Sequence, residues 1–133
     1  MKRYYKYKTT NGQIIGLVTT NIDMTQAKSN HIEYVEYNEP YSIDTTLVYH
    51  DLDSNKIKNR PVIDCKNNIS TTVRKAIKIN NLPDNTKVFL DDNEIAIVDD
   101  GVLELVIPVD GTYVLKLIPE FPYIEKIINV EVK

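Results

Sequence analysis

The sequence has one cysteine, no tryptophan and two histidines among its 133 residues. The single Cys65 excludes an internal disulfide framework and any zinc site built from cysteines. It ends the apolar run 61–65 without a CxxC motif, so we interpret it as a buried structural thiol rather than a nucleophile. His31 and His50 fall in separate predicted strands, which favours an exposed position on a strand surface for both.

Basic residues are also scarce: 16 Lys and Arg stand against 19 Asp and Glu, a net charge of −3. Binding to nucleic acid requires a basic face that neutralises phosphates. The one basic cluster, within residues 2–8, is more simply a solvated strand edge. No apolar run approaches the about 20 residues that cross a membrane, and no signal peptide is recognisable. We therefore expect no nucleic-acid partner, no membrane, and synthesis in a cytoplasm.

Catalytic and phosphate-binding motifs are missing too, and we expect no enzyme, cofactor or metal site. Residues 51–55 open like a calcium loop, but Lys56 and Val62 replace the Gly and Glu of an EF-hand, which favours a hairpin turn. Five carboxylates fall on two neighbouring turns, at Asp91, Asp92, Glu94, Asp99 and Asp100. They could share a cation or act as acid and base, but acidic side chains also favour turns because they bond nearby backbone amides.

Short alternating segments separated by turn residues dominate what is present. In the first half, Asn11-Gly12 lies between two such segments and predicts a hairpin closed by a type I′ turn. Residues 24–30 could form one short helical turn. A third strand is predicted over 31–37, and a second hairpin over 46–58.

Six more strands are predicted in the second half, at 75–79, 87–90, 94–98, 103–107, 112–118 and 124–132. Tyr113 opens a late strand, where sandwich folds often anchor a loop through a tyrosine hydroxyl. We therefore predict an all-β chain. An N-terminal antiparallel β-hairpin module for docking spans residues 1–64, and a small immunoglobulin-like β-sandwich spans 65–133. Another small Greek-key arrangement is the alternative.

Tyrosine is the main aromatic residue, with nine copies against two phenylalanines. Five in the N-terminal half form a predicted stripe: Tyr4, Tyr5, Tyr7, Tyr34 and Tyr37. Exposed tyrosine is a common contact residue, so an exposed and contiguous stripe would be the best candidate for a partner-binding surface. Alternatively, the rings only form the packed face of a sheet.

Several short motifs follow one another along the chain: Tyr4-Tyr5, Asn11-Gly12-Gln13-Ile14-Ile15-Gly16, Tyr34-Val35, Arg60-Pro61, Leu82-Pro83, Asp100-Gly101, Gly111-Thr112-Tyr113 and Phe121-Pro122-Tyr123. In this order, over nearly the whole chain, they resemble small virion or tail-associated proteins of tailed bacteriophages. The resemblance implies a structural part of the virion, near the tail or its fibres. It also implies assembly with other virion proteins in multiple copies, and it transfers no functional residue.

Four other functions stay open at this point. A tail-fibre assembly chaperone would bind fibre protein and be absent from mature particles. A carbohydrate-binding adhesion module would use the tyrosine face, and a head decoration protein would cover the capsid. An enzyme would need the carboxylates of Asp92, Glu94 and Asp100 to converge in three dimensions.

Overall fold

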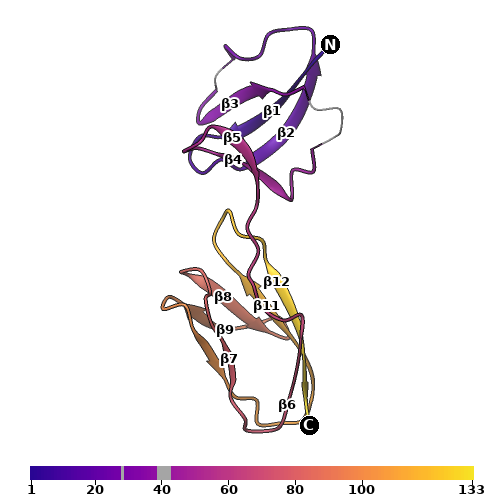
Figure 1. Cartoon of the computed structure of the whole chain (residues 1–133), viewed down its shortest axis with the longest axis vertical. Helices are drawn as coiled ribbons and strands as arrows, with labels where there is room; N and C mark the ends of the chain where they lie inside the picture. Colours follow the sequence, from indigo (N-terminus) through magenta and orange to yellow (C-terminus); the bar gives the residue numbers. More distant parts are fainter. Residues whose placement is uncertain (28, 39–42) are drawn as a thin grey trace. The chain divides into compact units, whose positions relative to one another are not determined.

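The computed structural model describes residues 1–27, 29–38 and 43–133, which form twelve β-strands and no helix (Figure 1). The predicted all-β class is confirmed. Of the helical turn predicted within 24–30, the described residues show a single turn, in which the Ala27 amide donates to the Met24 carbonyl at 3.0 Å, and no helix. The chain divides into two compact units, Met1–Arg60 and Pro61–Lys133. The boundary predicted from the sequence, between residues 64 and 65, lies four positions after the boundary in the structure.

The N-terminal unit holds a three-stranded sheet in the order β2-β1-β3 and a separate hairpin, β4-β5. The strands are β1 Lys2–Lys8, β2 Ile14–Thr20, β3 Ile32–Glu36, β4 Val48–Asp51 and β5 Lys56–Asn59. The central strand β1 pairs antiparallel with both neighbours, so all its backbone groups can be satisfied within the sheet. Both predicted hairpins and the predicted third strand are therefore present.

The C-terminal unit is a sandwich of a five-stranded sheet, β6-β12-β11-β8-β9, and a two-stranded sheet, β10-β7. The strands are β6 Asn68–Thr71, β7 Ile77–Ile79, β8 Thr86–Leu90, β9 Asn93–Val98, β10 Leu103–Leu105, β11 Gly111–Ile118 and β12 Lys126–Val132. Strand β6 is parallel to β12, whereas the other pairs are antiparallel. The order β12-β11-β8-β9 matches strands G, F, C and C′ of an immunoglobulin-like sandwich, and β7 with β10 matches B and E.

The core of the C-terminal unit lies between its two sheets and comes from alternate residues of the strands. Leu115 and Leu117 of β11 and Ile128 of β12 are completely buried there. The Tyr113 hydroxyl donates a hydrogen bond to the Val109 carbonyl at 2.8 Å and holds the loop before β11. This bond confirms the loop anchor that the sequence predicted at Tyr113.

The predicted type I′ turn of the first hairpin is wrong. Residues 9–13 connect β1 to β2, and Gly12 is the only one of them with a positive φ, 84°. A type I′ turn needs two successive residues with positive φ. That combination occurs between β8 and β9, where Asp91 and Asp92 have φ of 46° and 67° and form the whole connection.

Candidate interaction surfaces

The five tyrosines of the predicted stripe do not form one exposed face. Tyr4, Tyr5 and Tyr7 of β1 expose only 0%, 3% and 5% of their surface. Tyr34 and Tyr37 are half-buried. The expectation of an exposed, contiguous stripe is therefore wrong for the three tyrosines of β1, and only the other two keep surface for a partner.

The rings also divide between the two faces of the β2-β1-β3 sheet, because consecutive residues of a strand point to opposite sides. Tyr5 and Tyr7 share one face, and their rings lie 6.3 Å apart. The ring of Tyr37 lies 6.3 Å from Tyr5 on this same side. Tyr4 lies on the opposite face with Tyr34, whose strand neighbour across the sheet is Lys6. Burial of both Tyr4 and Tyr5 means that both faces of β1 are covered.

The prediction that His50 lies exposed on a strand surface is wrong, because only 1% of its surface is exposed. His50 organises the core on the Tyr5 side, and we call its contacts the Tyr–His cluster. The ring of His50 stacks on Tyr7 with centroids 3.8 Å apart and an angle of 15°. His50 Nδ1 lies 2.8 Å from the Tyr5 hydroxyl, and Nε2 lies 2.8 Å from Asn55 Oδ1. The Tyr7 hydroxyl donates to Glu33 Oε2 at 2.8 Å. The cluster therefore ties β1 to β3 and to the β4-β5 hairpin.

The hydrogen bonds assign one protonation state to the cluster. Asn55 Oδ1 can only accept, so His50 Nε2 carries a proton and Nδ1 accepts from the Tyr5 hydroxyl. Burial lowers the pKa of His50 below 6.5, against the opposing effects of Asn55 and nearby carboxylates. Burial also raises the pKa of Tyr5 and of Tyr7 to about 12. His50, Tyr5 and Tyr7 therefore cross-link the unit as neutral side chains.

The loop that opens like a calcium site is the turn of the β4-β5 hairpin, as predicted. Asp51 pairs with Lys58 Nζ at 2.8 Å and accepts a hydrogen bond from the Ser54 hydroxyl at 2.7 Å. These two bonds lower the pKa of Asp51 to about 2. The carboxylate thus fastens the hairpin in which it lies.

The carboxylates of the C-terminal unit also bond to backbone amides. Asp91 Oδ1 accepts from the Val114 amide at 2.8 Å, and Asp100 Oδ1 accepts from the Val102 amide at 3.2 Å. Among residues 1–27, 29–38 and 43–133, no three His, Cys, Asp or Glu side chains group closely enough to hold a metal ion. Cys65 is half-buried against the core, and burial raises the pKa of its thiol.

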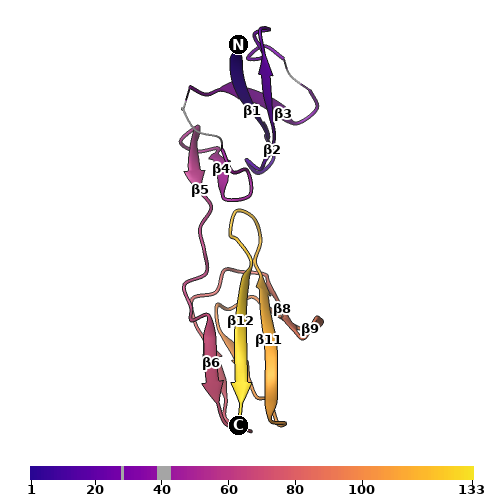
Figure 2. The same cartoon turned by 90° about the vertical axis from the view of Figure 1, so that its right-hand side faces the viewer.

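Strands β6, β12 and β11 lie side by side in the five-stranded sheet (Figure 2). The face of this sheet that points away from the core carries apolar side chains on four adjacent strands. The register places on it Ile127 of β12, Val114 of β11, Phe89 of β8 and Ile97 of β9. We call these four residues the outward row. Ile127, Val114 and Ile97 expose 49%, 45% and 58% of their surface, and Phe89 is half-buried. The four lie diagonally across neighbouring strands, and Lys116 lies directly between Ile127 and Phe89. Apolar side chains gathered on one face of a sheet mark an interaction surface more often than single scattered residues do.

A groove of about 520 Å³ lies at the side of the sandwich, between β6 at the edge of one sheet and β7 at the edge of the other. Its apolar lining includes Cys65, Ile69 and Ile77, and we call it the β6/β7 groove. A second hollow of about 470 Å³ lies across β6, β12 and β11. Neither hollow was predicted, because β6 itself was missed and both hollows depend on its position.

No protein-family model, curated protein or solved structure matches the chain. In the part of the chain that the structure describes, no helix is long and apolar enough to cross a membrane. Information about function therefore comes from the order of the sequence motifs and from the surfaces described above.

Proposed function

We propose that this protein is a structural component of a tailed bacteriophage particle, associated with the tail or its fibres. It acts by protein–protein assembly and without catalysis, in several copies per virion. The outward row carries the proposal, because it is an apolar surface on a rigid sandwich and suits a permanent protein contact. The ordered resemblance of the motifs to tail-associated proteins supports the phage assignment.

The outward row is large enough to matter energetically. Complete burial of an aliphatic or aromatic side chain contributes about 1.5–3 kcal/mol, and these side chains are already about half-buried. Covering all four would therefore contribute on the order of 4 kcal/mol before the costs of association. Lys116 lies on the same face between Ile127 and Phe89. Lys87 lies opposite Ile97, so both lysines can place their aliphatic stems against the row.

The N-terminal unit offers a smaller surface for docking. Tyr34 and Tyr37 are its remaining half-exposed tyrosines of the predicted stripe, and the Arg3 guanidinium lies 4.8 Å from the Tyr37 ring centre. Arg and Tyr are both enriched at protein interfaces. A carbohydrate-binding module is less well supported, because three of the five rings it would use are buried.

Complementation of a phage that lacks the gene tests this function. The double variant Val114→Glu/Ile127→Glu places two charges on the outward row. We expect it to fold, as judged by an unchanged melting curve, but to be missing from purified particles. Thr112→Glu is the matched control, since it adds a carboxylate on the same face outside the row. Equal incorporation of the double variant and the control would refute the role of the row.

A further inference from the structure

The β6/β7 groove lies between two strand edges that have no partner within the C-terminal unit, all of which is described. Strand β6 pairs only with β12, and β7 pairs only with β10. The carbonyls of Asn67, just before β6, and of Thr71, at its end, accept hydrogen bonds from β12 and from the residue that follows it. Since alternate residues of a parallel strand address the same neighbour, Asn68 and Ser70 direct their backbone groups away from β12. Such groups are a ready template for another strand.

The groove also has an apolar lining that an added strand would cover. Ile69 and Cys65 are half-buried within it, and Ile77 of β7 is buried at its base. An immunoglobulin-like sandwich commonly has a further strand beside B, the position that β7 occupies here. In residues 61–133 no strand stands in that position. An extended segment in the groove would complete the small sheet and cover this side of the core.

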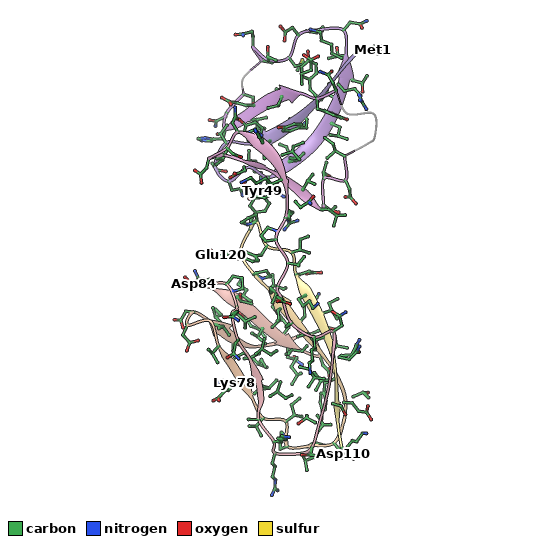
Figure 3. All side chains as sticks on the ribbon, viewed as in Figure 1. Met1, Tyr49, Lys78, Asp84, Asp110 and Glu120 are labelled. Carbon is green, nitrogen blue, oxygen red and sulfur yellow. The ribbon has the colours of Figure 1, made fainter. Side chains whose placement is uncertain are left out.

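Positive charge surrounds the groove. Three lysines, Lys66, Lys75 and Lys78, and one aspartate, Asp64, line it, and all four are exposed. Lys78 lies at the middle of β7 (Figure 3). The strand that fits should therefore carry acidic residues at its ends and apolar residues on its exposed side.

The same unit presents such a strand at its opposite edge. Strand β9 pairs only with β8, and its Ile95 and Ile97 expose 43% and 58% of their surface. Five acidic residues and no basic residue lie in 91–100: Asp91, Asp92, Glu94, Asp99 and Asp100. A register shift interrupts the pairing of β8 with β9, and residues 96–98 of β9 form its longest regularly paired stretch. This stretch has the same length as β7, whose three residues are 77–79.

We propose that β9 of one copy adds as a strand to the β6/β7 groove of a second copy. Strands β6 and β9 are the two edges of one sheet, so a copy does not fill its own groove, and the contact is head-to-tail. A head-to-tail contact repeats from copy to copy and forms a ring or a filament. This contact makes a second copy of the chain one partner in the assembly role proposed above. It rests on that role only for the location of the assembly in a virion.

Sedimentation velocity of the full chain over a range of concentrations tests the contact. We expect assemblies larger than a dimer at high concentration, weakened by added salt because exposed charges are screened. Lys75→Glu/Lys78→Glu and, separately, Glu94→Lys/Asp99→Lys should each weaken association at least about tenfold. Asp110→Lys is the matched control outside both surfaces and should associate like the wild type.

Mixing the two double variants gives the decisive result. The acidic groove of the first then faces the basic β9 of the second, so mixed pairs should form although neither variant associates alone. A wild-type chain that stays monomeric, a closed dimer that ignores these changes, or a mixture that fails to associate would each overturn the proposal. Association with no incorporation into particles would overturn the virion role and leave this contact standing. Incorporation into particles of a chain that does not self-associate would overturn this contact and leave the virion role standing.

Discussion

Acidification should destabilise the N-terminal unit through His50. This histidine is 1% exposed, stacks on Tyr7 and accepts a hydrogen bond from Tyr5 in its neutral form. Protonation puts a charge in the core and forces the Tyr5 hydroxyl to turn its proton away. Burial accordingly lowers the pKa of His50 in the folded unit below its ordinary value of 6.5.

The direction in which stability changes with pH follows from the proton that His50 takes up on unfolding. Below pH 6.5 the unfolded chain gains a proton at His50 that the folded unit takes up only at a lower pH. The stabilising effect of neutral His50 is therefore fully present above pH 6.5. It is lost as the pH falls toward the lowered pKa, with a slope of at most about 1.4 kcal/mol per pH unit.

Urea titration followed by NMR resolves this effect, because amide signals report each unit separately. We expect the free energy of unfolding of the N-terminal unit to fall between pH 7.5 and pH 5.5, chosen to span the ordinary histidine pKa of about 6.5. His50→Phe keeps a ring against Tyr7 but removes the titrating group. It should cost about 1–3 kcal/mol at neutral pH, because the Tyr5 hydroxyl and Asn55 lose their partner.

The pH slope, rather than the loss of stability, distinguishes the mechanism. His50→Phe should abolish the part of the slope that lies near pH 6. The control is His31→Asn, which removes an exposed histidine and tolerates the positive φ of 60° at that position. If His50→Phe keeps the wild-type slope, or if His31→Asn removes it, the assignment to the Tyr–His cluster is refuted.

Three further substitutions test the fold, each by urea unfolding. Gly12→Ala should destabilise the N-terminal unit by at least about 2 kcal/mol, because its Cβ would lie 1.9 Å from the His50 carbonyl oxygen at a φ of 84°; a stable variant would contradict this packing. Asp92→Gly should stabilise the C-terminal unit by about 0.5–1 kcal/mol, since glycine adopts the positive φ of 67° without strain; a loss of stability would count against the turn. Tyr113→Phe should cost about 0.5–1 kcal/mol, because the bond to the Val109 carbonyl is exposed and water replaces the lost donor, and no change would show that the loop anchor is dispensable.

The sandwich could be predicted because its signals are local. Alternation along 112–118 and 124–132 follows from the two faces of a half-buried strand, and Tyr113 marks the start of β11. Strand β6 was missed because it is short, follows polar Asn67, and gains its partner β12 from the far end of the unit. The type I′ turn was predicted at the wrong connection because Asn11-Gly12 lies in a longer loop, whereas Asp91 and Asp92 adopt positive φ within a two-residue connection.

The candidate surfaces could not be predicted in the same way. Whether Tyr4 and Tyr5 are exposed depends on what covers each face of β1, which is a tertiary property. Nor could His50 be assigned to a core, because its partners Tyr5 and Tyr7 lie more than forty positions away in the sequence. The exposure of Ile95 and Ile97 and the position of the β6/β7 groove are likewise set by the fold.

The structural role in a virion is tested most directly by quantitative mass spectrometry of purified particles of the phage that encodes this protein. The account predicts that the protein is present, at a copy number that matches the symmetry of the tail or its fibres. Absence from particles, with the protein abundant in infected cells, would contradict it and favour an assembly chaperone. A copy number close to that of the capsid protein would also contradict the tail position and indicate a head decoration protein.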